Sequence, residues 1–112
     1  MYTALSDLNR TSGIKGSMLV GSDGIIIAAD MDSQLEDETV GAMSASIVSN
    51  VSKAMERLQN ESPAQITIEA ENGKLFMADA GVGILTVITE NNVNIGLIRL
   101  EMKNVISKIS GK

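Results

Sequence analysis

Nucleophilic side chains are plentiful in the middle of the chain, but the residues that would activate them are missing. Residues 44–52 contain four serines. A serine nucleophile needs a base and an orienting group within hydrogen-bond reach. The sequence contains no histidine and no cysteine, and Lys53 is the only lysine between residues 36 and 59. These serines are therefore interpreted as packing and surface residues, and we expect no catalytic residue and no enzymatic activity.

Carboxylates gather between residues 30 and 38, and clustered carboxylates are the ligands that hard cations prefer. The segment lacks the ligand spacing and the mid-loop glycine of an EF-hand. Acidic side chains in the first turn of a helix stabilise its positive end by about 0.3 to 1 kcal/mol each. We therefore expect a helix start and no metal site. The carboxylates are those of Asp30, Asp32, Glu36, Asp37 and Glu38.

Glycines recur in two places where a phosphate-binding loop could be sought, at positions 13–24 and at Gly81 and Gly83. A P-loop requires Gly-Lys-Ser/Thr at the start of a helix, and a dinucleotide site requires its glycines between a strand and a helix. Gly81 and Gly83 instead join two expected strands. We interpret these glycines as turn residues and expect no nucleotide and no other cofactor.

The overall composition restricts the partners and the location. The net charge is −5 and the sequence pI is about 4.6, whereas phosphate binding requires clustered Lys and Arg, so we expect no nucleic-acid partner. No segment approaches the roughly 18 apolar residues of a membrane helix, which predicts no membrane insertion. The N-terminus has neither a basic start nor an apolar run, so no signal peptide is expected and the predicted location is cytoplasmic. A length of 112 residues predicts one domain, 1–112.

The longest predicted element is a helix over residues 36–59, which contain no proline and one glycine. At about 1.5 Å per residue it would be about 36 Å long, enough to cross a whole sheet. Apolar residues recur along it at three- and four-residue steps and form one stripe, which predicts the face that contacts the core. The stripe consists of Val40, Met43, Ile47, Val51, Ala54 and Leu58.

The other side of this helix carries small side chains at four-residue spacing. A helix face that only contacts water usually carries Lys, Glu, Arg and Gln, which are better helix formers than Ser or Gly. The small residues therefore favour close packing against a second backbone, most simply a copy of the same chain; the alternative is a serine-rich face exposed to water. The face contains Gly41, Ala45, Ser49 and Ser52, with Val48 and Met55 at its border.

The remaining segments predict an α+β fold. A short helix is expected at 3–10, strands at 14–20, 25–29, 65–71, 74–79 and 84–89, and a final helix at 95–110. Two hairpins are indicated by Asp23-Gly24 and Asn72-Gly73. The strand at 65–71 alternates apolar and polar residues, which is typical of a strand exposed on one face.

This order of elements, together with the SDG hairpin, the small-residue-rich helix and the NGK hairpin, resembles the Roadblock family of dynein light chains and prokaryotic GTPase regulators. The resemblance implies a profilin-like fold with a five-stranded antiparallel sheet in the order 2-1-5-4-3. It implies the long helix on one face and the terminal helices on the other. It also implies a homodimer, in which the long helices pack side by side and the third strands pair. The expected dimer interface is Gly41, Ala45, Val48, Ser49, Ser52, Met55, Ile66, Thr67 and Ile68.

The resemblance further implies a function as a non-enzymatic regulator that binds a small Ras-like GTPase. Lys53 and Arg57 lie four residues apart, a spacing that suits acidic loops of a partner or, alternatively, a charge pair in water. Two other functions remain open, a structural adaptor that joins larger proteins and, less favoured, a small-ligand sensor. The expected partner-binding residues are Glu38, Ala42, Ala45, Ser49, Lys53 and Arg57.

Overall fold

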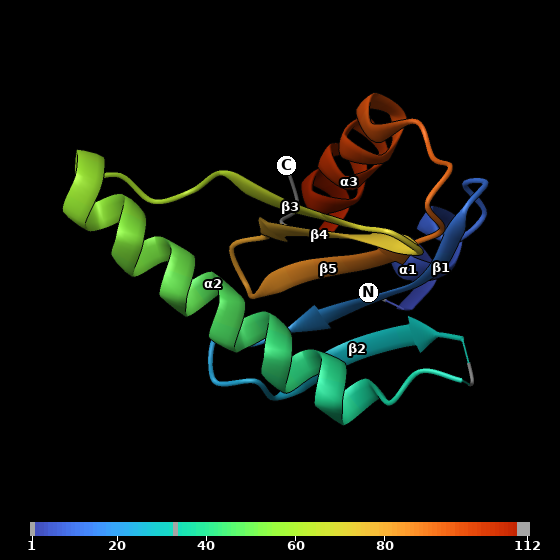
Figure 1. Ribbon diagram of the computed structural model, residues 1–112. Helices are drawn as coiled ribbons and strands as arrows, with labels where there is room; N and C mark the ends of the chain where they lie inside the picture. The colour runs from blue at the N-terminus through green and yellow to red at the C-terminus, as the bar shows by residue number, and fades with distance from the viewer. Residues whose placement is uncertain (1, 33, 110–112) are drawn as a thin grey trace.

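Three helices and five antiparallel strands make up the computed structural model, which describes residues 2–32 and 34–109 (Figure 1). The predicted order of elements is confirmed, with boundaries that shift by up to two residues. Ser110, the last residue of the predicted final helix, lies outside the described residues. The elements are α1 (Tyr2–Leu8), β1 (Ile14–Val20), β2 (Ile26–Met31), α2 (Asp37–Gln59), β3 (Gln65–Ala70), β4 (Gly73–Asp79), β5 (Ile84–Thr89) and α3 (Ile95–Ile109).

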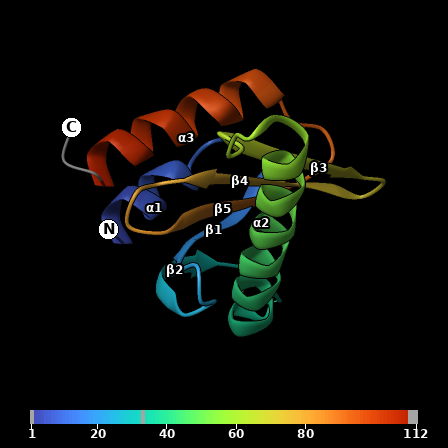
Figure 2. The ribbon, with the colours of Figure 1, turned by 90° about the vertical axis from the view of Figure 1, so that its left-hand side faces the viewer.

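The strands form one sheet in the order β2-β1-β5-β4-β3, as the resemblance implied. β1 and β5 pair at the centre over the register Ser17↔Val87, while β2 and β3 form the two edges. Helices α1 and α3 lie on one face of the sheet and α2 on the other (Figures 1 and 2). The result is a three-layer α/β/α arrangement.

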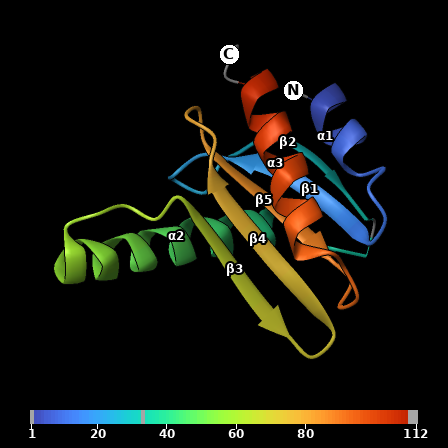
Figure 3. The same cartoon turned by 90° about the horizontal axis from the view of Figure 1, so that it is seen from above.

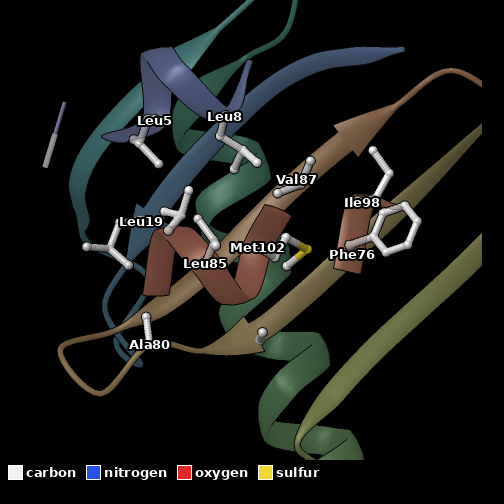
Figure 4. Packing of buried hydrophobic residues seen from close by; sticks show 11 residues of the cluster. Leu5, Leu8, Leu19, Phe76, Ala80, Leu85, Val87, Ile98 and Met102 are labelled. Atoms are coloured by element: carbon white, nitrogen blue, oxygen red, sulfur yellow. The ribbon is translucent and has the colours of Figure 1, made fainter. Parts of the chain in front are cut away.

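The larger of the two hydrophobic clusters fills the layer between the sheet and the helices α1 and α3. Leu5 and Leu8 enter it from α1, and Ile98 and Met102 from α3, where all four are almost completely buried. Their partners come from alternate positions of the central strands, because successive side chains of a strand point to opposite faces. Figure 4 shows these side chains converging from the helices and strands on one layer; the strand residues include Leu19, Phe76, Leu85 and Val87.

A smaller cluster lies beneath α2, on the opposite face of the sheet. Met18 and Met77 are fully buried there, and Val40, Ile47 and Val48 of α2 pack against them. Contacts of α2 with the sheet go mainly to β1, β2 and β5. Seen from above, the C-terminal half of α2 projects beyond the ends of the strands (Figure 3). The helix therefore crosses the sheet diagonally and leaves part of this face uncovered.

The ends of α2 have ordinary helix-terminus geometry. Glu36 precedes the helix in an extended conformation, and Asn60 ends it in the left-handed region with φ of 56°. The Asn60 N–H donates to the Glu56 carbonyl, which satisfies one of the last free carbonyls of the helix. Pro63 follows shortly after, where it prevents any continuation of the helix.

The buried layer under α1 and α3 predicts the effect of a matched pair of leucine truncations. Leu85→Ala removes a side chain that is 0% exposed, so we expect it to lower the free energy of unfolding by about 3 kcal/mol. Leu100→Ala removes the same atoms from a position that is 54% exposed, and we expect a change below about 0.5 kcal/mol. Urea unfolding followed by circular dichroism measures both, and equal effects would contradict this assignment of the core.

Candidate binding surface on the long helix

The fully buried positions on the side of α2 that faces the sheet are occupied by small residues. Gly41, Ser44 and Ala45 are buried there. A Cβ atom added at Gly41 would lie 3.3 Å from three atoms of the β1–β2 hairpin, namely the Gly24 carbonyl oxygen, Ile26 Cγ1 and Val20 Cγ2. The absence of a side chain at Gly41 therefore lets α2 lie close against this hairpin.

The buried position of Gly41 and Ala45 corrects their assignment to a dimer interface, and it removes Ala45 from the expected partner-binding set. The prediction of a close backbone approach is correct, but the backbone is that of the chain's own hairpin. Val48 and Ser52 follow on the same side, where they line a pocket of about 290 Å³ together with Gly81. These two residues are only half-buried.

The predicted core stripe is also rotated relative to the observed buried face. Val40, Ile47 and Val51 are half-buried as expected of a core-facing stripe. Met43 is 56% exposed and Leu58 is 78% exposed, so the stripe prediction is wrong at these two positions. Ala54 is exposed as well. Met43 is exposed because the small residues allow the opposite flank of the helix to turn inward. Leu58 lies on the same side of the helix as Val40, and it is exposed because the C-terminal half of α2 projects beyond the sheet (Figure 3).

The side of α2 that points away from the sheet holds the remaining predicted partner-binding residues. Glu38, Ala42, Ser49, Lys53 and Arg57 are all exposed. At about 100° per residue they lie on the side of the helix opposite the buried Ser44. Short side chains occupy the middle of this outward face, and charged side chains occupy its ends. The outward face is therefore a shallow strip that is acidic at one end and carries Lys53 and Arg57, with Glu56 between them, at its other, basic end.

A groove of about 550 Å³ lies between α2 and the uncovered part of the sheet. Val40 and Met43 form its wall on the helix, and apolar residues of β3, β4 and β5 form its floor. Ile68, on that floor, is 39% exposed. Charged side chains line its rim. The floor includes Ile68, Leu75 and Ile88, and the rim includes Lys15, Glu71 and Lys74.

The three β3 residues assigned to the dimer interface differ in which layer they face. Ile66 packs into the cluster beneath α2, and Ile68 points to the same face. Thr67 points to the other face, where its Oγ1 accepts a hydrogen bond of 3.0 Å from Arg99 Nη2 of α3. β3 pairs with β4 on one side, and no strand within the described residues pairs with its outer edge. Met55 of α2, also assigned to the interface, is half-buried beside the loop that leads into β3.

Comparison with known proteins identifies the fold family. Residues 2–89 match the Roadblock/LC7 domain. The chain belongs to the Roadblock/LC7 domain family. Two proteins of Methanocaldococcus jannaschii, uncharacterized proteins MJ0714 and MJ0310, are each 44% identical to it over 105 residues, with 94% of this chain and 89% and 92% of those proteins covered.

Solved structures share the fold at low sequence identity. A Roadblock/LC7 domain from Streptomyces avermitilis aligns with a TM-score of 0.91 at 19% identity, covering 99% of this chain and 95% of that one. Myxococcus xanthus MglB gives 0.91 at 20% identity, covering 98% and 91%. Schizosaccharomyces pombe profilin gives 0.66 at 12% identity, covering 97% and 92%, which agrees with the profilin-like fold.

The acidic segment of this Roadblock/LC7 domain is engaged in local hydrogen bonds. Asp32 Oδ1 accepts a bond from the Gln34 N–H at 3.0 Å, and Glu36 Oε2 accepts one from Thr39 Oγ1 at 2.9 Å. Within residues 2–32 and 34–109 there is no group of three or more acidic, histidine or cysteine side chains placed to hold a metal ion. No helix in the same residues is both long enough and apolar enough to cross a membrane.

The contact at Gly41 predicts that two neighbouring substitutions differ in how much they change the free energy of unfolding. Gly41→Leu forces a side chain into the β1–β2 hairpin, so we expect the free energy of unfolding to fall by about 1 to 3 kcal/mol. Ala42→Leu adds a larger side chain to the outward face, and we expect a change below about 0.5 kcal/mol. Chemical denaturation at two protein concentrations measures both. A Gly41→Leu protein of normal stability would mean that this side of α2 does not contact the sheet.

Proposed function

We propose that this Roadblock/LC7 domain is a non-enzymatic homodimer that binds a small Ras-like GTPase and regulates it. The observation that carries the proposal is the outward face of α2, which is free of intramolecular packing and has short side chains at Ala42 and Ser49. Roadblock/LC7 domains are generally binding domains without catalytic activity. The GTPase as partner comes from the family resemblance, and the exposure of this face supports it as the docking surface.

Self-association is supported by apolar surface that the single chain leaves exposed. The groove between α2 and β3 has an apolar floor, and the C-terminal half of α2 projects beyond the sheet (Figure 3) with Leu58 largely exposed. In a two-fold pair the projecting end of each helix would cover the groove of the other copy. MglB occurs in a tetrameric arrangement in one solved structure, which aligns here with a TM-score of 0.83 at 18% identity, covering 96% of this chain and 82% of that one.

The proposed interface therefore differs from the expected one on α2. It uses the flank that carries Met43 and Leu58 in place of the flank that carries Gly41 and Ala45. The β3 edge, with Ile66 and Ile68 beside the groove, stays part of the interface. Pairing of the two β3 edges would satisfy backbone groups that are otherwise a template for aggregation.

The outward face suits the surface of a GTPase for reasons of shape and charge. Short side chains along the middle of α2 allow a partner loop to approach the helix backbone closely. Lys53 and Arg57 at the basic end can pair with acidic residues of that loop, and Glu38 at the other end can pair with basic ones. Contacts of this kind would steady or reshape the switch loops of the GTPase without an inserted arginine.

The groove predicts which substitution separates the dimer. Met43→Arg places a charge on the groove wall, so we expect the protein to sediment as a monomer at micromolar concentrations. Ser46→Arg places the same side chain on the outward face and should leave the dimer intact. Sedimentation velocity distinguishes the two, with circular dichroism as a check on folding. An unchanged dimer in the Met43→Arg protein would contradict the proposed interface.

The outward face predicts a nucleotide-dependent interaction. We expect the immobilised protein to retain a small GTPase from a lysate of its source organism, and the purified GTPase to bind more tightly with a non-hydrolysable GTP analogue than with GDP. The double substitution Ala42→Arg and Ser49→Arg should abolish this binding without changing the sedimentation coefficient. Equal binding with both nucleotides would instead favour a structural adaptor. Unchanged binding of the GTPase by the double variant would mean that the site lies elsewhere.

A further inference from the structure

The strand β2 forms the second edge of the sheet, at the end opposite β3. The Asp32 N–H donates to the Lys15 carbonyl at 3.2 Å, and these residues stand opposite each other in the register that pairs Gly16 with Met31. Hydrogen-bonded and non-hydrogen-bonded pairs alternate in an antiparallel ladder. The backbone groups of Ala29 and Met31 therefore point away from β1, at the outer side of the sheet.

This edge has one irregularity of register at its start, where Leu19 and Val20 pair with Ala28 and Ile26, but it lacks the other protection that sheet edges usually carry. Proline, lysine, a very short strand or an inward-pointing charge normally prevent pairing with another chain. β2 contains neither proline nor lysine, and Asp30 is its only charged residue. The apolar side chains at its start are exposed, Ile25 by 67% and Ile27 by 45%.

Helix α2 extends past the β2 edge and forms a wall beside it. In Figures 1 and 2, which share one vertical axis, the first turn of α2 reaches lower than β2, beyond the last strand of the sheet. A strand added next to β2 would therefore contact this turn as well as the edge. On the opposite face, Asn9 Nδ2 donates to the Asp30 carbonyl at 2.6 Å and fixes β2 to the segment after α1.

The charges of the segment that contains β2, from Asp23 to Glu38, are of one sign. Six carboxylates and no lysine or arginine occur between Asp23 and Glu38. The nearest basic residue in the ladder is Lys15 on the neighbouring strand β1, opposite Asp32. A second copy of this chain would bring a second acidic edge, because a two-fold contact places like residues together. A partner with basic residues would instead be attracted.

We propose that the β2 edge binds an extended, lysine- or arginine-rich segment of a partner protein, which adds a sixth strand to the sheet. Backbone hydrogen bonds to Ala29 and Met31 hold the segment, as in other cases of strand addition. The carboxylates of Asp23, Asp32 and Asp37 select for its charge. This interaction does not rest on the proposed GTPase-binding function, because its backbone hydrogen bonds are made by the edge of the sheet; the two surfaces meet only at the first turn of α2, where Asp37 and Glu38 lie.

The test uses a labelled peptide of about nine residues with alternating lysine and valine, a length typical of a strand. Fluorescence anisotropy measures binding, and amide hydrogen exchange by NMR locates it. We expect the Ala29 and Met31 amides to exchange about tenfold more slowly with the peptide at saturation. The Ala28 and Asp30 amides, which face β1, serve as internal controls and should not change.

Two control peptides separate strand addition from simple charge attraction. A glutamate-valine peptide keeps the strand propensity and reverses the charge, and a lysine-proline peptide keeps the charge but cannot form a ladder. Neither should bind. Equal binding of the lysine-proline peptide, or binding without slowed exchange at Ala29 and Met31, would overturn the proposal. Slowed exchange at these amides in concentrated protein alone would identify a second copy as the occupant and would also overturn it.

Two further variants test the edge from the protein side. Ala29→Pro removes the outward N–H and should abolish binding, whereas Ala29→Ser keeps the N–H and should retain it. Should Ala29→Pro fail to fold, the double variant Asp23→Asn and Asp32→Asn tests the charge selection instead. It removes two negative charges but keeps the side-chain oxygens that accept bonds from the Ile25 and Gln34 N–H groups. We expect it to bind the lysine-valine peptide about fivefold more weakly at low salt. Unchanged affinity in this variant would refute the charge selection.

Discussion

The contact between α2 and the β1–β2 hairpin at Gly41 determines which surfaces this protein offers to others. A helix is rigid along its length, so a rotation that is fixed at one residue is fixed for the whole helix. A Cβ atom added at Gly41 would lie only 3.3 Å from the carbonyl oxygen of Gly24. The side of α2 that carries Gly41 therefore faces the sheet. Ser44 and Val48 then follow it inward, and the opposite side, with Ala42 and Lys53, must face outward.

Much of the fold could be predicted from the sequence because its signals are local. Hairpins at Asp23-Gly24 and before Gly73, the alternation in β3 and the apolar run of β5 each define an element within a few residues. The order of the strands in the sheet came from the family resemblance. No local signal gives that order, because it depends on contacts between residues far apart in the chain.

The rotation of α2 could not be predicted from hydrophobic periodicity. That method assigns the core to the side with the largest apolar side chains, and here Met43 and Leu58 place the expected stripe on one flank. Gly41 and Ser44 add little apolar area, yet they are buried because the helix lies close to the hairpin. The useful signal was Gly41 itself, since a glycine inside a helix costs about 1 kcal/mol relative to alanine and calls for a packing reason. The same rotation explains why Ala45 is buried while Ala42, Ser49 and Lys53 are exposed.

The two edges of the sheet have the same backbone chemistry but differ in the charges beside them. In β3, Glu69 is the one charged residue and stands opposite Lys74 in the register, although the Lys74 ammonium itself donates to the Asn91 carbonyl and to Asn91 Oδ1. Near β2, Asp30 and Asp32 stand in a segment of six carboxylates that contains no lysine or arginine, and the basic residue opposite Asp32 is Lys15 of β1. Self-pairing is therefore favoured at β3 and opposed at β2.

The two charged ends of α2 act independently of each other. Glu38 and Lys53 are fifteen residues apart, which corresponds to about 22 Å along the helix axis. Charges exposed to water are largely screened beyond about 8 Å at physiological ionic strength. A basic segment bound beside the acidic first turn would therefore leave the field at Lys53 and Arg57 almost unchanged. One helix can for this reason carry an acidic end and a basic end whose charges act independently, because neither end alters the charge that the other presents.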